Sequence, residues 1–312
     1  MTKTILALQP LLPLEMEELV RQYKVLRLWE NRDPEKFIIE HAHEISGVLS
    51  TYNSHGVSER LIEALPNLEI IAQFGVGYDN VDVDAASRRD IVVTNTPDVL
   101  TDDTADVAMM LLLNVMRRAV EGDMFVRVGR WQGGAMPLGT SVSGKTVGIV
   151  GLGKIGQAIA DRALAFNTEI VYHSREMKDV PYTYYESLED MARASDVLVL
   201  ACAGGEETHH LINYKILKAL GPKGFLINIA RGSVVDEDEL LIALRNKAIG
   251  GAGLDVFAHE PNVPQEMIKM DNVVLSPHVG SATMETRALM GQLVINNLVA
   301  HFSGKPLLTP VN

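Results

Sequence analysis

Short apolar runs alternate with amphipathic segments along most of the chain. In the first third, the apolar runs predict strands at residues 4–8, 25–29, 47–52, 68–74 and 91–94. Helical periodicity predicts helices between them at residues 14–22, 58–64 and 81–87. This alternation is typical of a parallel, doubly wound α/β sheet.

The same alternation resumes after residue 145. Strands are expected at residues 146–150, 169–173, 197–201, 225–229, 253–256 and 273–275, and helices at residues 187–194, 214–220 and 236–245. The last helix, about residues 283–302, is long enough to cross back and pack on the first part of the chain. The pattern therefore predicts two α/β domains.

A long helix is expected to begin at Thr101, which can cap it and precedes two acidic residues of the first turn. Its apolar stripe is wide and comprises Ala105, Ala108, Met109, Met110, Leu111, Leu112, Val115 and Met116. Such a helix must be buried on several sides, either in a core or against a second subunit. The break at Pro97 indicates a domain boundary just before it.

Length and charge narrow the class of protein. A chain of 312 residues exceeds the usual size of one hydrophobic core. Its 28 Lys and Arg against 40 Asp and Glu residues argue against a nucleic-acid or anionic-membrane partner. No apolar run approaches the ~20 residues of a membrane span, and the first residues lack the order of a signal peptide. We therefore expect a cytoplasmic protein.

Three glycines follow the strand at residues 146–150 with the spacing G-x-G-x-x-G. Gly151 permits a sharp turn, Gly153 allows a pyrophosphate to approach the backbone, and Gly156 lets the next helix pack closely on the strand. The first turn of that helix offers free N–H groups and the positive end of its dipole. The motif predicts a dinucleotide site, although glycines also mark ordinary turns.

Polar residues follow three of the later strands directly, at residues 228–232, 254–261 and 275–280. Because ligands of open α/β sheets bind beyond the carboxyl ends of the strands, Arg231, Glu260 and His278 are expected around one crevice. A surface salt bridge is the alternative for any pair of them. Two glycines within residues 74–79 could likewise expose backbone N–H groups to a carboxylate, or form a plain turn.

The remaining candidates carry less chemistry. The pairs His41 and His43, and His209 and His210, have no Cys or carboxylate arrangement that indicates a metal site, so solvated histidines are expected. The single cysteine, Cys202, cannot form an internal disulfide. It is interpreted as a small buried residue near a strand end rather than a nucleophile.

The sequence resembles the D-2-hydroxyacid dehydrogenase family, and within it the glyoxylate/hydroxypyruvate reductase branch. The matching stretches are FGVGYDNVD, NTPDVLTDDTADVA, GIVGLGKIG, NIARGSVVDE, GLDVF with HEP, and SPHVGSAT, which together span residues 71–284. The resemblance implies a Rossmann-type cofactor domain, residues 99–284, inserted into a flavodoxin-like substrate domain, residues 1–98 and 285–312. The two domains of this family surround a cleft.

The resemblance implies that His278 is the general acid–base, Glu260 its partner and Arg231 the substrate-orienting cation. Reduction of a 2-keto acid needs a proton at the oxygen, and imidazole can give one near neutral pH. Glu260 would favour the charged form of His278, and Arg231 can form paired hydrogen bonds to a carboxylate and keto oxygen. The backbone of Val76 and Gly77 and the side chain of Ser281 are implied substrate contacts.

The same resemblance carries over a set of cofactor contacts, in which Asp255 holds the nicotinamide carboxamide. The implied contacts are Thr104, Gly151, Gly153, Lys154, Ile155, Gly156, His173, Ser174, Arg175, Cys202, Thr208, Ile229, Asp255, His278 and Gly280. Ala203 replaces a proline that is common in the family, which affects the expected adenine pocket and not the chemistry. No metal is expected.

The end of the strand at residues 169–173 bears on which cofactor is used. NAD-selective folds place an acid near this point to bind the ribose 2′-OH, whereas alignment with the family places Ser174 there. Arg175 can pair with a 2′-phosphate and Ser174 can donate to it, so NADPH is favoured over NADH. Glu176 is the alternative ribose ligand, but it should lie past the strand end and point away.

The expected activity is reduction of glyoxylate, hydroxypyruvate or a similar small 2-keto acid. One alternative is a reductase of bulkier substrates such as arylpyruvates; residues 51–54 would line the side-chain pocket, and their polarity favours small substrates. Another is a nucleotide-regulated binding module of the corepressor type, against which we weigh the absence of long tails. The wide apolar helix and the family resemblance predict a homodimer, with Trp131 or residues 136–138 reaching the neighbouring active site.

Overall fold

A computed structural model describes residues 2–52 and 56–312 as two compact units. The first unit comprises Met1–Leu100 and Ser281–Asn312, and the second comprises Thr101–Gly280. The expected domains were residues 1–98 with 285–312, and residues 99–284. Each unit is an α/β layer structure, so the predicted fold class of two parallel-sheet domains is confirmed.

The first unit contains a five-stranded parallel sheet. The spatial order is β2 (Lys24–Arg27), β1 (Thr4–Ala7), β3 (Ile45–Thr51), β4 (Ile70–Phe74) and β5 (Val92–Thr94). This 2-1-3-4-5 order is that of flavodoxin-like sheets. Every residue of β3 and β4 is buried, as expected of strands that are covered by helices on both faces.

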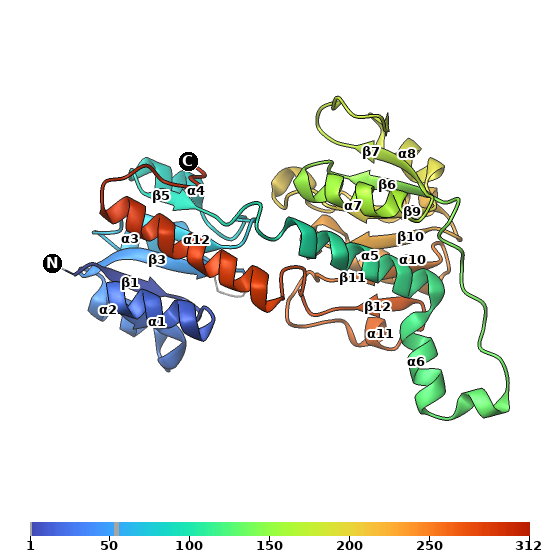
Figure 1. Cartoon of the computed structure of the whole chain (residues 1–312), viewed down its shortest axis with the longest axis horizontal. Helices are drawn as coiled ribbons and strands as arrows, with labels where there is room; N and C mark the ends of the chain where they lie inside the picture. Colours follow the sequence, from blue (N-terminus) through green and yellow to red (C-terminus); the bar gives the residue numbers. More distant parts are fainter. Residues whose placement is uncertain (1, 53–55) are drawn as a thin grey trace. The chain divides into compact units, whose positions relative to one another are not determined.

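Helices α1 (Pro13–Gln22), α2 (Pro34–His41), α3 (Glu59–Ala64), α4 (Val83–Arg88) and α12 (Met284–Phe302) surround this sheet. The last of them, drawn in red in Figure 1, packs on β4 and α1 as the sequence predicts. Gly291 allows the close approach of α1, because a Cβ there would lie 2.6 Å from the Glu15 side chain. The C-terminal helix therefore completes the core of the N-terminal segment.

The second unit contains a seven-stranded parallel sheet. The spatial order is β12 (Val273–Leu275), β11 (Gly251–Leu254), β10 (Phe225–Asn228), β9 (Val197–Leu200), β6 (Thr146–Val150), β7 (Glu169–His173) and β8 (Thr183–Tyr184). The chain starts in the middle of the sheet at β6 and later reverses direction to β9. That reversal is the topological switch point at which nucleotides bind in such sheets.

Helices cover both faces of this sheet. One face carries α5 (Thr101–Arg117) and α7 (Lys154–Leu164), and the other carries α8 (Leu188–Ala194), α9 (Tyr214–Leu220) and α10 (Glu237–Arg245). The short α11 (Gln265–Ile268) precedes β12. The wide apolar stripe of α5 packs on β10, β11 and α7, so much of its girth is buried within the unit itself.

Residues 118–145 form an arm, which consists of α6 (Ala119–Arg127), η2 (Arg130–Gly133) and an extended return to β6. Figure 1 shows this arm leaving the body of the second unit and coming back to the sheet. No residue of α6 is buried. Helix α6 therefore adds nothing to the core of its own unit, whereas Val142 in the extended return is buried in that core.

The structure corrects several local expectations. Residues 28–30 form a 3₁₀ turn (η1) and not the end of a strand, and the helices α2 and α6 were not anticipated. The start of α2 has a recognisable signal, because Asp33 caps it by accepting from Lys36 N and Pro34 occupies its first turn. The apolar residues of α2 occupy a single turn, which is too short to show a helical period.

Candidate active site

The glycine turn after β6 fits a dinucleotide. Gly151 has φ +93°, and a Cβ there would lie 2.6 Å from Cys202 N. A Cβ on Gly156 would lie 2.3 Å from Gly151 O, whereas one on Gly153 would meet nothing within 4 Å. The outer glycines are thus required by packing, and the middle one leaves open space beside the backbone, as close approach of a pyrophosphate requires.

The helix that follows offers donors for that pyrophosphate. Gly153 is the N-cap residue of α7 and provides no side chain to cap it, and Lys154 and Ile155 open the first turn. The first N–H groups of a helix have no partner within the helix, and they attract an anion together with the helix dipole. The predicted phosphate site therefore has the geometry that the motif implies.

The end of β7 carries the residues expected at the adenosine ribose. His173 Nδ1 lies 2.9 Å from Tyr185 O, and Ser174 Oγ donates to Glu176 O at 2.5 Å. The Arg175 side chain is 91% exposed, and its Nη1 lies 3.7 Å from Glu207 Oε2 of η3 (Glu206–Thr208). Glu176 is exposed as well, so both a cation and an acid are available at this edge.

Three further predicted contacts follow β9 and β10. Burial raises the pKa of the Cys202 thiol to about 11, so the residue is no activated nucleophile at neutral pH. Thr208 Oγ1 donates to Ala203 O at 2.8 Å and closes the loop after β9, and Ile229 is buried directly after β10. Of the three, Cys202 lies directly against the glycine turn, at Gly151.

Asp255 organises the loop after β12. The side chain is 1% exposed, and its carboxylate accepts from Ser276 Oγ at 2.5 Å, Val279 N at 2.9 Å and Gly280 N at 2.9 Å. Thr104 Oγ1 of α5 donates to Gly280 O at 3.0 Å. The predicted cofactor residues Thr104, Asp255 and Gly280 therefore form one network that shapes residues 276–280.

His278 lies in this loop and pairs with Glu260. The imidazole Nδ1 is 2.7 Å from Glu260 Oε2, and the other carboxylate oxygen accepts from Phe257 N at 3.0 Å. Burial alone would raise the pKa of Glu260, but the bond and charge of His278, the Phe257 N–H and the charge of Arg231 outweigh it. The net effect lowers the pKa of Glu260, which therefore stays ionised at neutral pH.

Arg231 is brought to the same pair by packing between two loops. Gly232 lies so close to the loop after β11 that a Cβ there would be 2.0 Å from Phe257 C. Asn228 holds the turn on both sides, because its Oδ1 accepts from Ala230 N at 3.0 Å and its Nδ2 donates to Arg231 O at 2.9 Å. Sequence reasoning assigned no role to Asn228 or Gly232, although both lie within the matched NIARGSVVDE stretch.

The three residues predicted to catalyse the reaction thus come together within the second unit. The predicted substrate contacts Val76, Gly77 and Ser281 belong to the first unit. Ser281 O accepts from Arg287 Nε at 3.0 Å. Of residues 51–54, the structure describes Thr51 and Tyr52, and the remainder of that predicted side-chain pocket lies outside the described residues.

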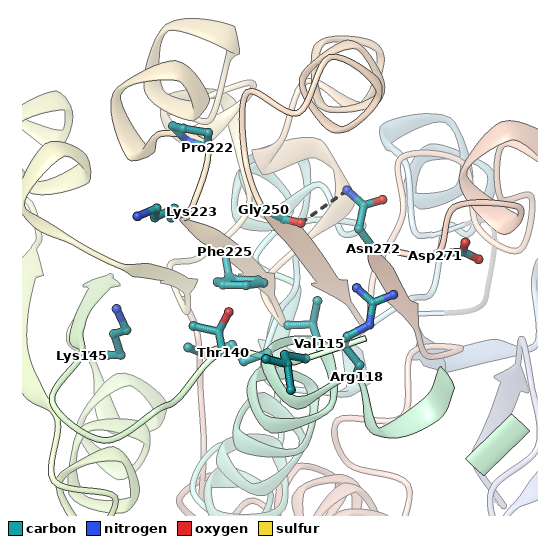
Figure 2. A pocket seen from close by; sticks show the side chains of 13 residues that line it. Val115, Arg118, Thr140, Lys145, Pro222, Lys223, Phe225, Gly250, Asp271 and Asn272 are labelled. Atoms are coloured by element: carbon teal, nitrogen blue, oxygen red, sulfur yellow. Dashed lines mark hydrogen bonds between the residues drawn. The ribbon is translucent and has the colours of Figure 1, made fainter. Parts of the chain in front are cut away.

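A cavity of about 360 Å³ lies at the other end of the second sheet. Figure 2 shows its lining residues, among them Lys145, Phe225, Gly250 and Asn272, which stand at the amino ends of β6, β10, β11 and β12. Lys145 is paired with Asp196 at 2.9 Å. Nucleotides bind at the carboxyl ends of such strands, so this cavity is separate from the candidate site.

Two further findings concern membrane-spanning helices and metal-binding clusters. Within residues 2–52 and 56–312, no helix is both long and apolar enough to cross a membrane. The same residues include no group of three or more His, Cys, Asp and Glu side chains arranged to hold a metal ion.

The fold and the glycine turn define a nucleotide-binding α/β protein, and a His–Glu pair beside an arginine is an arrangement that can deliver a proton together with a hydride. Residues 109–280 match the family described as "D-isomer specific 2-hydroxyacid dehydrogenase, NAD binding domain". The chain belongs to this family of NAD(P)-dependent oxidoreductases, as its sequence motifs predict, and it is a 2-keto acid reductase.

Similar proteins extend over nearly the whole chain. A hydroxyphenylpyruvate reductase from Plectranthus scutellarioides is 52% identical, with 95% of this chain and 94% of that protein covered. The glyoxylate/hydroxypyruvate reductase A HPR2 of Arabidopsis thaliana is 50% identical, with 94% of each covered. The crystal structure of an NADPH-dependent glyoxylate/hydroxypyruvate reductase from Sinorhizobium meliloti, in complex with NADP and malonate, has a TM-score of 0.94 at 45% identity, covering 100% of this chain and 97% of that one.

Proposed function

We propose that the protein is an NADPH-preferring reductase of small 2-keto acids, which converts glyoxylate to glycolate and hydroxypyruvate to D-glycerate. The observation that carries this proposal is the His278–Glu260 pair, held beside Arg231 at the same sheet edge as the glycine turn. The residues present fit a nicotinamide dinucleotide, which when bound supplies the hydride for the carbonyl carbon.

The chain's own residues would supply the proton and the orientation. Glu260 would accept from Nδ1–H of His278, and Nε2–H of the same ring would be the proton given to the keto oxygen as that oxygen gains negative charge. The Arg231 guanidinium can bond the carboxylate and the keto oxygen together, which polarises the carbonyl and fixes its face. Backbone N–H groups of Val76 and Gly77, with Ser281, would hold the substrate carboxylate.

The preference for NADPH is argued from the end of β7. The hydroxyl of Ser174 and the guanidinium of Arg175 suit a 2′-phosphate, and no acid occupies the aligned position. The exposed pair of Arg175 with Glu207 is weak, so Arg175 remains available for a phosphate. The Sinorhizobium meliloti enzyme, named as NADPH-dependent, supports the same assignment.

A bulkier substrate is a second candidate, because the Plectranthus scutellarioides relative at 52% identity is named for hydroxyphenylpyruvate. One comparison tests both candidates. Glyoxylate, hydroxypyruvate and 4-hydroxyphenylpyruvate are each reduced with NADPH and with NADH, and kcat/KM is compared. The proposal expects the highest values for a small acid with NADPH. A higher value for 4-hydroxyphenylpyruvate would support the second candidate, and a higher value with NADH would contradict the cofactor preference.

We also propose a homodimer formed through the arm. Several large apolar side chains of the arm are exposed, including Val120, Met124, Trp131 and Leu138, of which Leu138 is 95% exposed. A monomer rarely displays so many apolar side chains on one projecting element. In this arrangement Trp131 or residues 136–138 would reach the active site of the partner.

A further inference from the structure

Three consecutive carbonyl groups of the loop after β4 are held by hydrogen bonds. Gly75 O accepts from Thr96 N at 2.9 Å, Val76 O from Asn95 Nδ2 at 2.9 Å and Gly77 O from Gln73 Nε2 at 3.2 Å. Two of these three donors are side-chain amides. The rotation of each of the three peptide groups is therefore set by a neighbouring residue and not by regular secondary structure.

This arrangement also sets the direction of the N–H groups. In a planar trans peptide the N–H points opposite to the carbonyl of the preceding residue. The N–H groups of Val76, Gly77 and Tyr78 are consequently turned away from the atoms that hold the carbonyls. The structure gives none of these three N–H groups a hydrogen bond within the described part of the chain. They are donors available to an anion.

The amides that hold the carbonyls are themselves anchored. Gln73 is fully buried in β4, and its Nε2 also donates to Asn80 Oδ1 at 3.1 Å. Asn80 Nδ2 in turn donates to Thr51 O at the end of β3, at 3.0 Å. The peptide of Asn95 pairs with Thr309, whose Oγ1 donates to Asn95 O at 2.7 Å. The loop is thus fixed to two strands and to the C-terminal segment.

The orientation of the Gln73 amide leaves one of its two polar atoms without a hydrogen bond. Its Oε1 is buried and has no hydrogen-bond partner among the described residues. The amide cannot rotate to relieve this, because its Nε2 faces two oxygens, Gly77 O and Asn80 Oδ1. An unpaired buried acceptor is destabilising, and an apolar side chain would avoid it. Gln73 therefore serves something other than packing.

We propose that Gln73 and Asn95 are positioning residues, which aim the N–H groups of residues 76–78 at the carboxylate of the 2-keto acid. This inference rests on the proposed function. The carboxylate does not change charge during reduction, so these N–H groups should bind substrate and transition state equally. Loss of either amide should then raise KM and leave kcat nearly unchanged.

The test compares Gln73→Leu and Asn95→Ala with the unmodified protein. We expect the KM for glyoxylate and the Kd for oxalate, measured on the NADP⁺ complex, to rise about five- to tenfold, as loss of one or two hydrogen bonds implies. kcat should change less than about twofold, and the Kd for NADPH should stay the same. Asn95→Ala carries the test if the buried Gln73 variant does not fold.

Asn312→Ala is the matched control. This amide bonds Val93 N at 2.8 Å, Ser87 Oγ at 2.8 Å and Ile91 O at 3.1 Å, all away from the loop after β4. Its loss should lower the melting temperature without raising KM. An unchanged KM in both amide variants, a fall in kcat alone, or an equal rise of KM in the control would each overturn the inference. Those outcomes overturn the inference alone. If the unmodified protein neither reduces a 2-keto acid nor binds oxalate, the proposed function fails, and this inference fails as well.

Discussion

His278 has an unusual backbone conformation for a residue with a side chain. Its φ is +53°, and its N–H donates to Asp255 O at 2.8 Å. The left-handed region is disfavoured for non-glycine residues and persists where the surroundings enforce it. The Asp255 carboxylate supplies that enforcement by binding the N–H groups of the two residues after His278. The imidazole is therefore aimed by its loop as well as by Glu260.

The first prediction concerns His278 as the donor of the proton in the proposed reduction. His278→Ala removes the only group that the proposed mechanism uses as an acid, so kcat should fall about 10²- to 10⁴-fold. The Kd for NADPH, followed by its fluorescence, should change little. An unchanged kcat would contradict the assignment of His278.

Glu260 supports a second prediction, on pH dependence. The pKa of Glu260 is held below its usual range, so its negative charge persists through neutral pH, and its Oε2 lies 2.7 Å from His278 Nδ1. A carboxylate beside a proton donor generally stabilises the protonated donor. Glu260→Gln keeps the shape and removes the charge. The alkaline limb of kcat/KM for reduction should then move to lower pH by about one unit. An identical pH profile in the variant would argue that the pair is only structural.

The points at which β7 and α12 end decide which side chains they place at the candidate site and in the core. The carboxyl end of β7 carries Ser174 and Arg175, the predicted contacts of the ribose, whereas α12 contributes by packing over β4. Both effects depend on where an element stops. The length of β7 decides that Glu176 falls beyond the strand, and the length of α12 brings His301 over the start of the first sheet, where it lies 3.7 Å from Glu69.

The third prediction changes the cofactor preference. Ser174→Asp combined with Arg175→Ala should shift the kcat/KM ratio from NADPH towards NADH by ~1.5–3 kcal/mol or more, because a charge-assisted bond is lost and a repulsion is added. Glu207→Gln is the control, since it removes only the exposed partner of Arg175. If the double variant still prefers NADPH, other residues read the phosphate.

His301 in α12 carries the fourth prediction. Burial lowers its pKa and the nearby Lys3 adds to this, while Glu69 opposes the shift in part. Between the lowered value and the ordinary one of 6.5, the unfolded chain takes up a proton that the folded chain does not. The folded state therefore loses stability as pH falls through that window.

Replacement of His301 by Gln should make the free energy of unfolding less dependent on pH below about pH 7, as measured by urea titration at several pH values. The same replacement at the exposed His43 is the control for a general effect of removing a histidine. An unaltered slope in the His301 variant would show that another group governs this range.

The whole molecule presents a projecting arm with an apolar surface, and the fifth prediction concerns its role in assembly. Val120 and Met124 lie one helical turn apart on α6 and are 51% and 52% exposed. Replacing both by Lys should weaken the proposed dimer without disturbing a core, because α6 has no buried residue. Sedimentation velocity should then show mainly the mass of one chain.

The control is Leu14→Lys, at an equally apolar but separate position of α1 that is 72% exposed. This variant should have the same sedimentation coefficient as the unmodified protein. If the unmodified protein already sediments as one chain at all concentrations, the homodimer is excluded.

The sequence alone determined the fold class and predicted where the candidate site lies. The strands of a buried parallel sheet appear in the sequence as regularly recurring apolar runs. The glycine spacing indicates a turn whose first and third positions have no room for a side chain. Arg231, Glu260 and His278 were likewise predicted as candidate site residues, because each follows a strand end, where ligands bind, and because the family resemblance implies their roles.

Only the tertiary structure decided which residues hold these groups in place. Asn228 and Gly232 position Arg231, Asp255 shapes the loop of His278, and Gln73 fixes Gly77 O. These contacts join segments that lie apart along the chain or bend back within a loop, so no local periodicity encodes them. Helix α6 was not predicted for a related reason, because none of its residues is buried within its own unit. The local sequence pattern indicates which side chains of a segment are buried. The orientation of the site residues depends on contacts between segments that only folding brings together.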